Sequence, residues 1–279
     1  MIIDFHAHVY PPSFKARREE IIRDDATFGE LFSSPRARLA TAPELVQAMG
    51  EAQVDATVLL GIGWSNKEVA REANDYILQA TREHPGILVG FCSVNPAWGK
   101  EAIREVERCA AQGAKGIGEL HPDTQNFDIT DRQQMAPLMD AAKRLGLMVL
   151  IHASEPVGHH YPGKGKTTPD KLWAFIQNFP DNTIVCAHWG GGLPFYTLMP
   201  EVEEGLANVY FDSAASPFLY RPAVFESAVD LLGAERVLLG TDYPLLPQRR
   251  LLAQVEESPL TPDEKDLILG GNARRLLGL

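Results

Sequence analysis

The chain has little cysteine. Only three cysteines occur among 279 residues, Cys92, Cys109 and Cys186, and each lies in an apolar or helical stretch far from the other two. An odd number of widely spaced cysteines in such surroundings is typical of buried free thiols and not of disulfides or metal ligands. We therefore expect a protein of a reducing compartment, the cytoplasm.

Long apolar runs and excess positive charge are also missing. No apolar run approaches the ~18 residues of a membrane span, and the first residues lack the basic and apolar segments of a signal peptide. The 26 basic and 37 acidic side chains give a formal net charge of −11. Because an acidic surface repels phosphate groups, we expect binding neither to nucleic acid nor to a membrane.

Short apolar segments alternate along the chain with longer amphipathic ones. Eight short segments rich in Val, Ile and Leu are predicted strands. They are residues 2–8, 55–62, 87–95, 114–121, 147–152, 183–188, 208–213 and 236–242. The stretches between them, such as 67–84, 99–112 and 130–145, space their apolar residues as helices do, with Thr130 as the expected N-cap and Gly146 as the stop of the third.

Eight strands alternating with helices indicate parallel pairing through right-handed crossovers. Eight such units in about 250 residues predict an α/β fold, a (β/α)8 TIM barrel, with residues 1–279 as one domain. The alternative is an open doubly wound sheet, but no GxGxxG motif follows the first strand.

Two predicted connections are too long for simple barrel loops. They are residues 10–41, after the first strand, and residues 154–169, after the fifth. Connections of this length are typical of functional lids or local insertions, although a solvated spacer is an equal interpretation of residues 10–41.

Ionisable side chains stand where the predicted strands end. His6 and His8 share one face of the first strand, because side chains alternate along a strand. Five more such residues end other strands: Glu119, His121, His152, His188 and Asp242. Barrel enzymes carry catalysis at the C-terminal strand ends, and unpaired buried charges are costly. A divalent cation bound by these imidazoles and carboxylates removes that cost, so the pattern predicts a metal site.

Five motifs together resemble those of a known superfamily. IIDFHAH, GIGELHP, LIHASEP, CAHWGGG and LLGTDYP are similar to motifs of the amidohydrolase superfamily. The similarity is greatest to the amidohydrolase-related branch, which includes aminocarboxymuconate-semialdehyde decarboxylase and related carboxy-lyases, hydratases and hydrolases. It covers the chain from His6 to Asp242 and on to the final GNARRLLGL, and it does not identify a substrate.

The resemblance implies a ligand set. His6, His8, His152 and Asp242 would bind a divalent cation, with zinc as the first expectation and manganese as the second. Asp242 would also contact water at the cation.

Glu119 and His188 keep two interpretations each. His188 would be a ligand of a second metal, or a catalytic group that donates hydrogen bonds and transfers protons. Glu119 stands where many two-metal relatives carry a carboxylated lysine or a bridging glutamate. We expect one ion, with Glu119 in contact with the substrate, and keep two ions bridged by Glu119 as the alternative.

Three functions follow in order. A divalent cation lowers the pKa of water, Asp242 would take the proton, and His188 would stabilise the oxyanion or protonate the leaving group. This predicts a metal-dependent hydrolase of a small, carboxylated molecule such as a lactone, amide or ester. The alternative is non-oxidative decarboxylation, or hydration, of an unsaturated or aromatic acid, with Asp242 protonating carbon. A non-catalytic binding barrel comes last, because no expected ligand is missing.

The segment 156–168, PVGHHYPGKGKTT, begins four residues after His152 and contains no acidic residue. A basic, glycine-rich loop above a metal suits a small organic anion, although a solvated loop is the alternative. The candidate substrate-binding residues are His121, His159, His160, Tyr161, Lys164 and Lys166. We also expect a homodimer, since barrels of this kind commonly associate.

Overall fold

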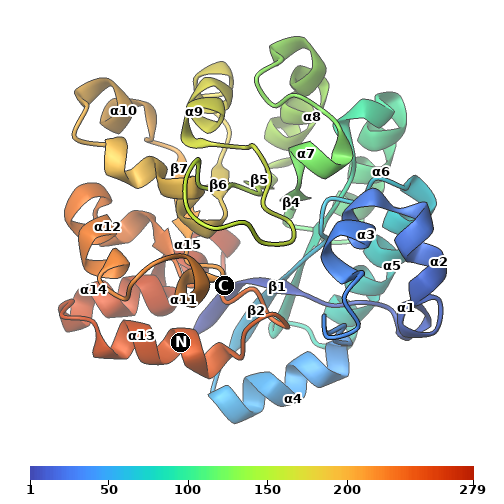
Figure 1. Ribbon diagram of the computed structural model, residues 1–279, viewed down its shortest axis with the longest axis horizontal. Coiled ribbons are helices and arrows are strands. Elements are labelled where there is room, and N and C mark those ends of the chain that lie inside the picture. Colours follow the sequence, from blue (N-terminus) through green and yellow to red (C-terminus); the bar gives the residue numbers. More distant parts are fainter.

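Eight parallel strands form the centre of the computed structural model, which describes residues 1–279. The sheet order is β1-β2-β3-β4-β5-β6-β7-β8, and every neighbouring pair is parallel. Figure 1 shows the strands around a common centre with helices outside them. The predicted α/β fold, a (β/α)8 TIM barrel, is confirmed.

All eight predicted strands are present. They are β1 (Ile3–His8), β2 (Ala56–Leu60), β3 (Leu88–Cys92), β4 (Gly116–Leu120), β5 (Met148–Ile151), β6 (Ile184–Cys186), β7 (Val209–Asp212) and β8 (Val237–Leu238). Most end earlier than predicted, so His121, His152, His188 and Asp242 follow their strands instead of closing them. His188 and Asp242 have φ of 55° and 65°, and such left-handed conformations cannot continue a strand.

Helices cover the outside of the sheet. The longer ones are α4 (Ala42–Ala52), α5 (Lys67–Glu83), α6 (Lys100–Ala111), α8 (Arg132–Leu145), α9 (Pro169–Asn178), α12 (Val224–Leu232) and α13 (Gln248–Glu257). The shorter ones are α7 (Pro122–Gln125), α10 (Pro200–Gly205), α11 (Ser216–Leu219), α14 (Pro262–Asp266) and α15 (Asn272–Leu277), with the turns η1 (Pro96–Trp98), η2 (His188–Tyr196), η3 (Ala234–Arg236) and η4 (Leu267–Gly271). None of the helices has the length and hydrophobicity needed to cross a membrane.

The ends of α8 show how local chemistry sets a boundary. The predicted N-cap Thr130 is wrong, because the carboxylate of Asp131 accepts hydrogen bonds from the backbone N–H groups of Gln133 and Gln134. The predicted stop is confirmed: Gly146 follows the helix with φ of 65°, a conformation that glycine adopts without strain.

Buried polar contacts link β8 back to β1. The N–H of Phe5 donates to the carbonyl of Leu239 (2.6 Å), and the N–H of Asp242 donates to the carbonyl of His6 (2.8 Å). Asp4, which is fully buried, accepts from the N–H of Thr241 (2.9 Å), the hydroxyl of Thr241 (2.6 Å) and the amide of Gln248 on α13 (2.8 Å). These bonds fix the segment that carries Asp242 against the strand that carries His6 and His8.

The long connection after β1, residues 10–41, is an ordered insertion and not a solvated spacer. It folds into α1 (Pro12–Ala16), α2 (Arg18–Asp24) and α3 (Ala26–Phe32). An aromatic cluster of Tyr10, Phe14, Phe28, Phe32 and Trp64 packs it against the barrel.

Asp25 adds polar contacts to this packing. Its carboxylate accepts from the N–H of Phe28 in the insertion and from the N–H groups of Ser65 and Asn66 after β2. The insertion is therefore held to the barrel by both apolar and polar contacts.

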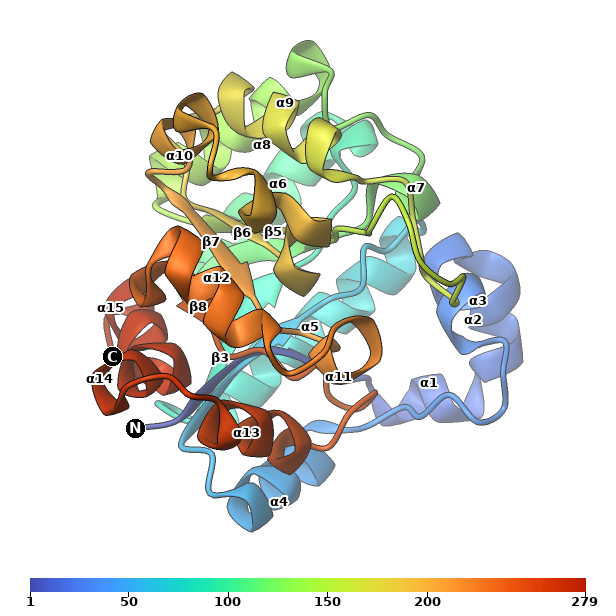
Figure 2. The same ribbon diagram turned by 60° about the vertical axis from the view of Figure 1, so that its left-hand side comes forward.

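The connection after β5, residues 152–168, arches over the centre of the barrel (Figure 1, yellow-green) and reaches α3 of the insertion (Figure 2). The N–H of Gly163 donates to Glu30 of α3 (3.3 Å). On the barrel side, the N–H of Lys166 and the hydroxyl of Thr167 donate to Asp123 of α7. We call this segment the β5 loop, and it covers the C-terminal end of the barrel.

Candidate metal centre and catalytic pocket

The two histidines of β1 face a carboxylate of β4. The Nε2 atoms of His6 and His8 lie 3.1 Å apart. Oε2 of Glu119 lies 3.5 Å from Nε2 of His6 and 3.7 Å from Nε2 of His8. From the far side of the barrel, Oδ1 of Asp242 lies 3.3 Å from Nε2 of His8 and 4.0 Å from Nε2 of His6. Two imidazoles and two carboxylates thus converge on one point.

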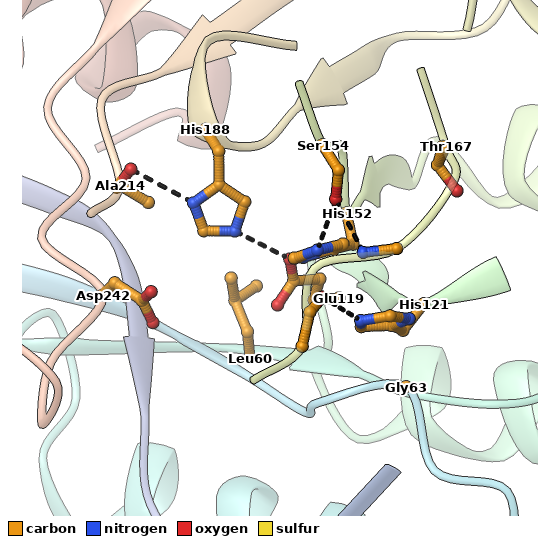
Figure 3. A network of polar contacts seen from close by, with 12 residues as sticks. Leu60, Gly63, Glu119, His121, His152, Ser154, Thr167, His188, Ala214 and Asp242 are labelled. Carbon is orange, nitrogen blue, oxygen red and sulfur yellow. Dashed lines mark hydrogen bonds and ion pairs between the residues drawn. The ribbon is translucent and has the colours of Figure 1, made fainter. Parts of the chain in front are cut away.

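The other oxygen of Glu119 faces two more histidines. Oε1 lies 2.8 Å from Nδ1 of His152 and 3.4 Å from Nε2 of His188. Figure 3 shows His152 and His188 approaching Glu119, with Asp242 to one side. The structure therefore does not place His152 in one group with His6 and His8, as the predicted ligand set has it. His152 and His188 form a second group that shares Glu119.

These donors fit a divalent cation. In the groups His6–His8–Glu119 and Glu119–His152–His188, one ligand atom from each residue lies within 4.8 Å of the others, and all five residues are buried. Neutral imidazoles and ionised carboxylates are good ligands of divalent ions such as zinc and manganese. Packing five such groups together away from water is costly unless a cation compensates them. The structure thus supports a divalent-metal site.

The charges of the cluster shift its pKa values in a consistent direction. Burial by itself raises the pKa of Glu119, but the charges of His6 and His152 outweigh it and hold that pKa well below its usual value. Burial likewise opposes, and the contact with His8 outweighs, a shift that lowers the pKa of Asp242 to about 2. Both carboxyl groups are therefore ionised at neutral pH, which is the state that binds a cation.

Asp212, at the end of β7, holds two members of the cluster. Its Oδ2 lies 2.8 Å from Nδ1 of His6, and its Oδ1 accepts from the N–H groups of His188 (3.0 Å) and Ala214 (3.0 Å). The contact to Nδ1 leaves Nε2 of His6 as the nitrogen that faces Glu119. Asp212 is fully buried, so these contacts are shielded from water. It thus orients the ring of His6 and the backbone of His188.

Above the cluster lies a cavity of ≈ 500 Å³. Its floor carries His8, Glu119, His152, His188 and Asp242. Apolar residues form much of its walls: Leu31, Phe32, Ala37, Ile62, Ala215, Phe218, Leu219 and Leu245. The exposed residues Arg36 and Arg38 of the insertion also line it. The cavity therefore combines a metal-binding floor, apolar walls and positive charge.

The candidate substrate residues fall into two sets. His121, His159 and Tyr161 line the cavity, whereas His160, Lys164 and Lys166 do not. The ammonium of Lys164 donates to the carbonyls of Val157 and His159, so it ties the β5 loop to itself. The positive charge beside the cavity comes from Arg36 and Arg38, and no motif in the sequence indicates that role.

His121 has both ring nitrogens in contact with protein groups. Its Nε2 lies 3.0 Å from the carbonyl of Gly163, and its Nδ1 lies 3.5 Å from the N–H of Thr124. The ring stacks on His152 with centroids 4.1 Å apart. Burial and the charge of His152 lower its pKa to about 4, so the ring is neutral at neutral pH. His121 thus connects the β5 loop to His152.

Comparison with known proteins identifies the family. The profile of the family described as "Amidohydrolase" matches residues 3–279. The chain belongs to the amidohydrolase family. The predicted resemblance to the decarboxylase-containing branch of the amidohydrolases is confirmed, and the chain is an enzyme of the amidohydrolase superfamily.

Similar proteins extend over nearly the whole chain of this amidohydrolase. A 2-amino-3-carboxymuconate-6-semialdehyde decarboxylase of Dictyostelium discoideum is 25% identical over 99% of this chain and 91% of its own. A 5-carboxyvanillate decarboxylase of Sphingomonas paucimobilis has a similar structure, with a TM-score of 0.81, 21% identity and coverage of 100% and 99%.

A second solved structure is also similar. It is a 5-carboxyvanillate decarboxylase of Novosphingobium aromaticivorans complexed with manganese and 4-hydroxy-3-methoxy-5-nitrobenzoic acid. Its TM-score is 0.83 at 19% identity, and the alignment covers 100% of this chain and 96% of that one. At these identities, the solved structures establish a shared fold.

Replacing Asp212 tests its role in the metal centre of this amidohydrolase. In D212N the ring of His6 loses its carboxylate partner, so we expect the affinity for Zn²⁺ or Mn²⁺ to fall about 10- to 100-fold. Competition with a chromophoric chelator measures this affinity. D123N is the control, because Asp123 binds the β5 loop and no histidine of the cluster. Equal affinity in D212N and the wild type would contradict the assigned role.

Proposed function

We propose that this protein is a metal-dependent carboxy-lyase, which removes CO₂ from a small aromatic or unsaturated carboxylic acid without oxidising it. The observation that carries the proposal is the cavity, which joins a floor of imidazoles and carboxylates to apolar walls and two arginines. A flat apolar ring with a carboxylate matches those surfaces. Relatives named as decarboxylases support this reaction above hydrolysis, which the sequence alone ranks first.

For the metal we propose one divalent cation beside His6, His8 and Asp242. Glu119 then takes the place of the predicted ligand His152, because its Oε2 faces the two β1 histidines and His152 lies at its other oxygen. Two imidazoles and two carboxylates suit manganese, which the similar 5-carboxyvanillate decarboxylase carries, so manganese replaces zinc as the first choice.

The reaction needs one bond broken and one proton supplied. When bound, the cation polarises an oxygen of the substrate. The bond between the carboxylate and its carbon then breaks, CO₂ leaves, and the electron pair stays on that carbon. The carbon takes a proton from Asp242 or His188, the two proton-carrying groups that meet across the cavity floor. The apolar walls keep water from this carbon.

Arg36 and Arg38 supply the attraction for an acid. Both line the cavity, and the guanidinium of Arg38 is positioned over the ring of Tyr243 at 5.5 Å, with an Nη2–H donating to the phenol oxygen at 3.3 Å. Against a formal net charge of −11, this local positive charge favours a small organic anion. The remaining lysines of the β5 loop, Lys164 and Lys166, act on the loop itself.

Hydrolysis is the second candidate, and the position of Glu119 favours it. One carboxylate with a pair of histidines at each oxygen is a suitable bridge between two cations. A two-cation centre can lower the pKa of water and clamp a substrate oxygen, which suits a lactone, amide or ester. Asp242 would take a proton and His188 would stabilise the developing oxyanion in that reaction.

For the whole chain, we propose that residues 1–279 act as one domain. The family profile over residues 3–279 and the sheet that runs from β1 to β8 support this organisation. The homodimer and the cytoplasmic location stay predictions.

Release of CO₂ tests the carboxy-lyase proposal. Protein loaded with Mn²⁺ is incubated with 5-carboxyvanillate, 2,6-dihydroxybenzoate and 6-methylsalicylate in deuterated water. We expect CO₂ from at least one acid, with one deuterium on the carbon that carried the carboxylate. D242N and metal-stripped protein are the controls, and both should lose the activity. Hydrolysis of lactones with no CO₂ from any acid would overturn the proposal.

The source of the attraction for the acid is tested by charge removal. R36A/R38A should raise KM for the acid about tenfold or more and leave kcat within about twofold, because the arginines act on binding and not on the reacting atoms. K164A/K166A removes the same charge from the β5 loop and should leave KM close to the wild-type value. The opposite ranking would assign substrate binding to the lysines.

The metal content distinguishes the two candidate reactions. For the carboxy-lyase we expect one equivalent of Mn²⁺ per chain in the wild type and a weakened site in E119Q, measured by mass spectrometry of the metal after dialysis. Two equivalents that fall to one in E119Q, together with lactone hydrolysis, would favour the bridged centre. N74A is a control with a buried polar residue outside the cluster.

A further inference from the structure

Tyr10 continues the pattern of His6 and His8 along the first strand. The three residues are spaced by two, and Tyr10 follows directly from the strand that ends at His8. The N–H of Tyr10 donates to the carbonyl of Ala40 at 2.8 Å, so the backbone stays extended against the end of the insertion. Tyr10 and His8 both line the cavity. The side chain therefore reaches the space above the metal centre.

The ring of Tyr10 is held by three aromatic neighbours. Its centroid lies 5.2 Å from Phe32, 6.3 Å from Phe28 and 6.4 Å from Trp64, in edge-to-face contacts. Only 2% of the residue is exposed. A ring packed on this many sides has little freedom to rotate, so its hydroxyl has a fixed position before any substrate binds.

The hydroxyl itself has no hydrogen-bond partner in the protein. The charged groups that act on it are Asp242 and Glu119, and no hydrogen bond contributes. It is also absent from the buried polar atoms that are sealed from solvent without a partner, so it opens into the cavity. Leaving a phenol this far from bulk water without a partner costs free energy that a bound acceptor recovers.

Other polar groups on the floor have different tasks. Glu119 and Asp242 are acceptors, and the imidazoles of His8, His152 and His188 point at these carboxylates. A phenol keeps its proton at neutral pH and can donate. Tyr10 is therefore the neutral O–H donor that a substrate oxygen meets at the cavity floor.

We propose that Tyr10 is a specificity-determining residue whose hydroxyl donates a hydrogen bond to an anionic oxygen of the bound acid. The proposal rests on the proposed function, because it takes an organic acid as the substrate. The O–H bond stays intact and no proton is transferred. Tyr10 thus selects an anionic oxygen near the metal centre, while Arg36 and Arg38 attract the acid to the cavity.

The test is Y10F, which removes the hydroxyl and keeps the ring. Isothermal titration calorimetry of the Mn²⁺-loaded protein measures Kd for benzoate and for benzyl alcohol, which share a ring and differ in charge. Loss of a hydrogen bond to a charged oxygen should raise Kd for benzoate about ten- to a hundredfold. Kd for benzyl alcohol should change less than about twofold, since a bond between neutral groups contributes little.

F28L is the matched control, because Phe28 packs against Tyr10 in the aromatic cluster and does not line the cavity. A purely structural role of Tyr10 predicts that F28L and Y10F change both affinities alike. The proposal predicts that F28L leaves the ratio of the two Kd values unchanged. Thermal unfolding of both variants verifies that they are folded.

Three results would overturn the proposal: a wild type that does not bind benzoate, a Y10F with wild-type affinity for benzoate, or equal loss for both ligands. Benzoate binding needs no turnover, so the outcome is independent of CO₂ release. A wild type that binds benzoate through Tyr10 and releases no CO₂ would refute the carboxy-lyase and leave this inference standing.

Discussion

The position of one buried carboxylate organises the functional end of the barrel. Glu119 presents Oε2 to His6 and His8, and Oε1 to His152 and His188. A carboxylate and four imidazoles so close together are stable only when charges are balanced, either by shared protons or by a cation. The same arrangement therefore accounts for the depressed pKa of Glu119, for the metal site and for both candidate reactions.

Support for this arrangement comes from residues that do not face the cavity. Asp212 orients His6 and the backbone of His188, and Asp4 holds the segment that carries Asp242 against β1. Both carboxylates are fully buried and accept several hydrogen bonds. A metal centre needs its ligands within fractions of an ångström, and such fixed contacts provide that precision.

Two long connections complete the cavity from opposite sides. The insertion after β1 contributes the arginines and an apolar wall, and the β5 loop crosses the barrel to meet it at Glu30. His121 joins this cover to the metal centre, because its ring contacts Gly163 and stacks on His152. A substrate in the cavity thus lies between a charged, polar floor and walls that exclude much of the water.

The sequence by itself determined the eight strands, the barrel and the convergence of His6, His8, Glu119 and Asp242, because strand periodicity and parallel pairing leave few other arrangements. It could not separate His152 from the first group, since a shift of a few ångströms past a strand end has no sequence signal. Only the tertiary structure decided that charge from the insertion, and not the lysines of the β5 loop, faces the cavity. The reason is that a loop's contacts depend on residues distant in the chain, here Glu30, Asp123 and the aromatic cluster.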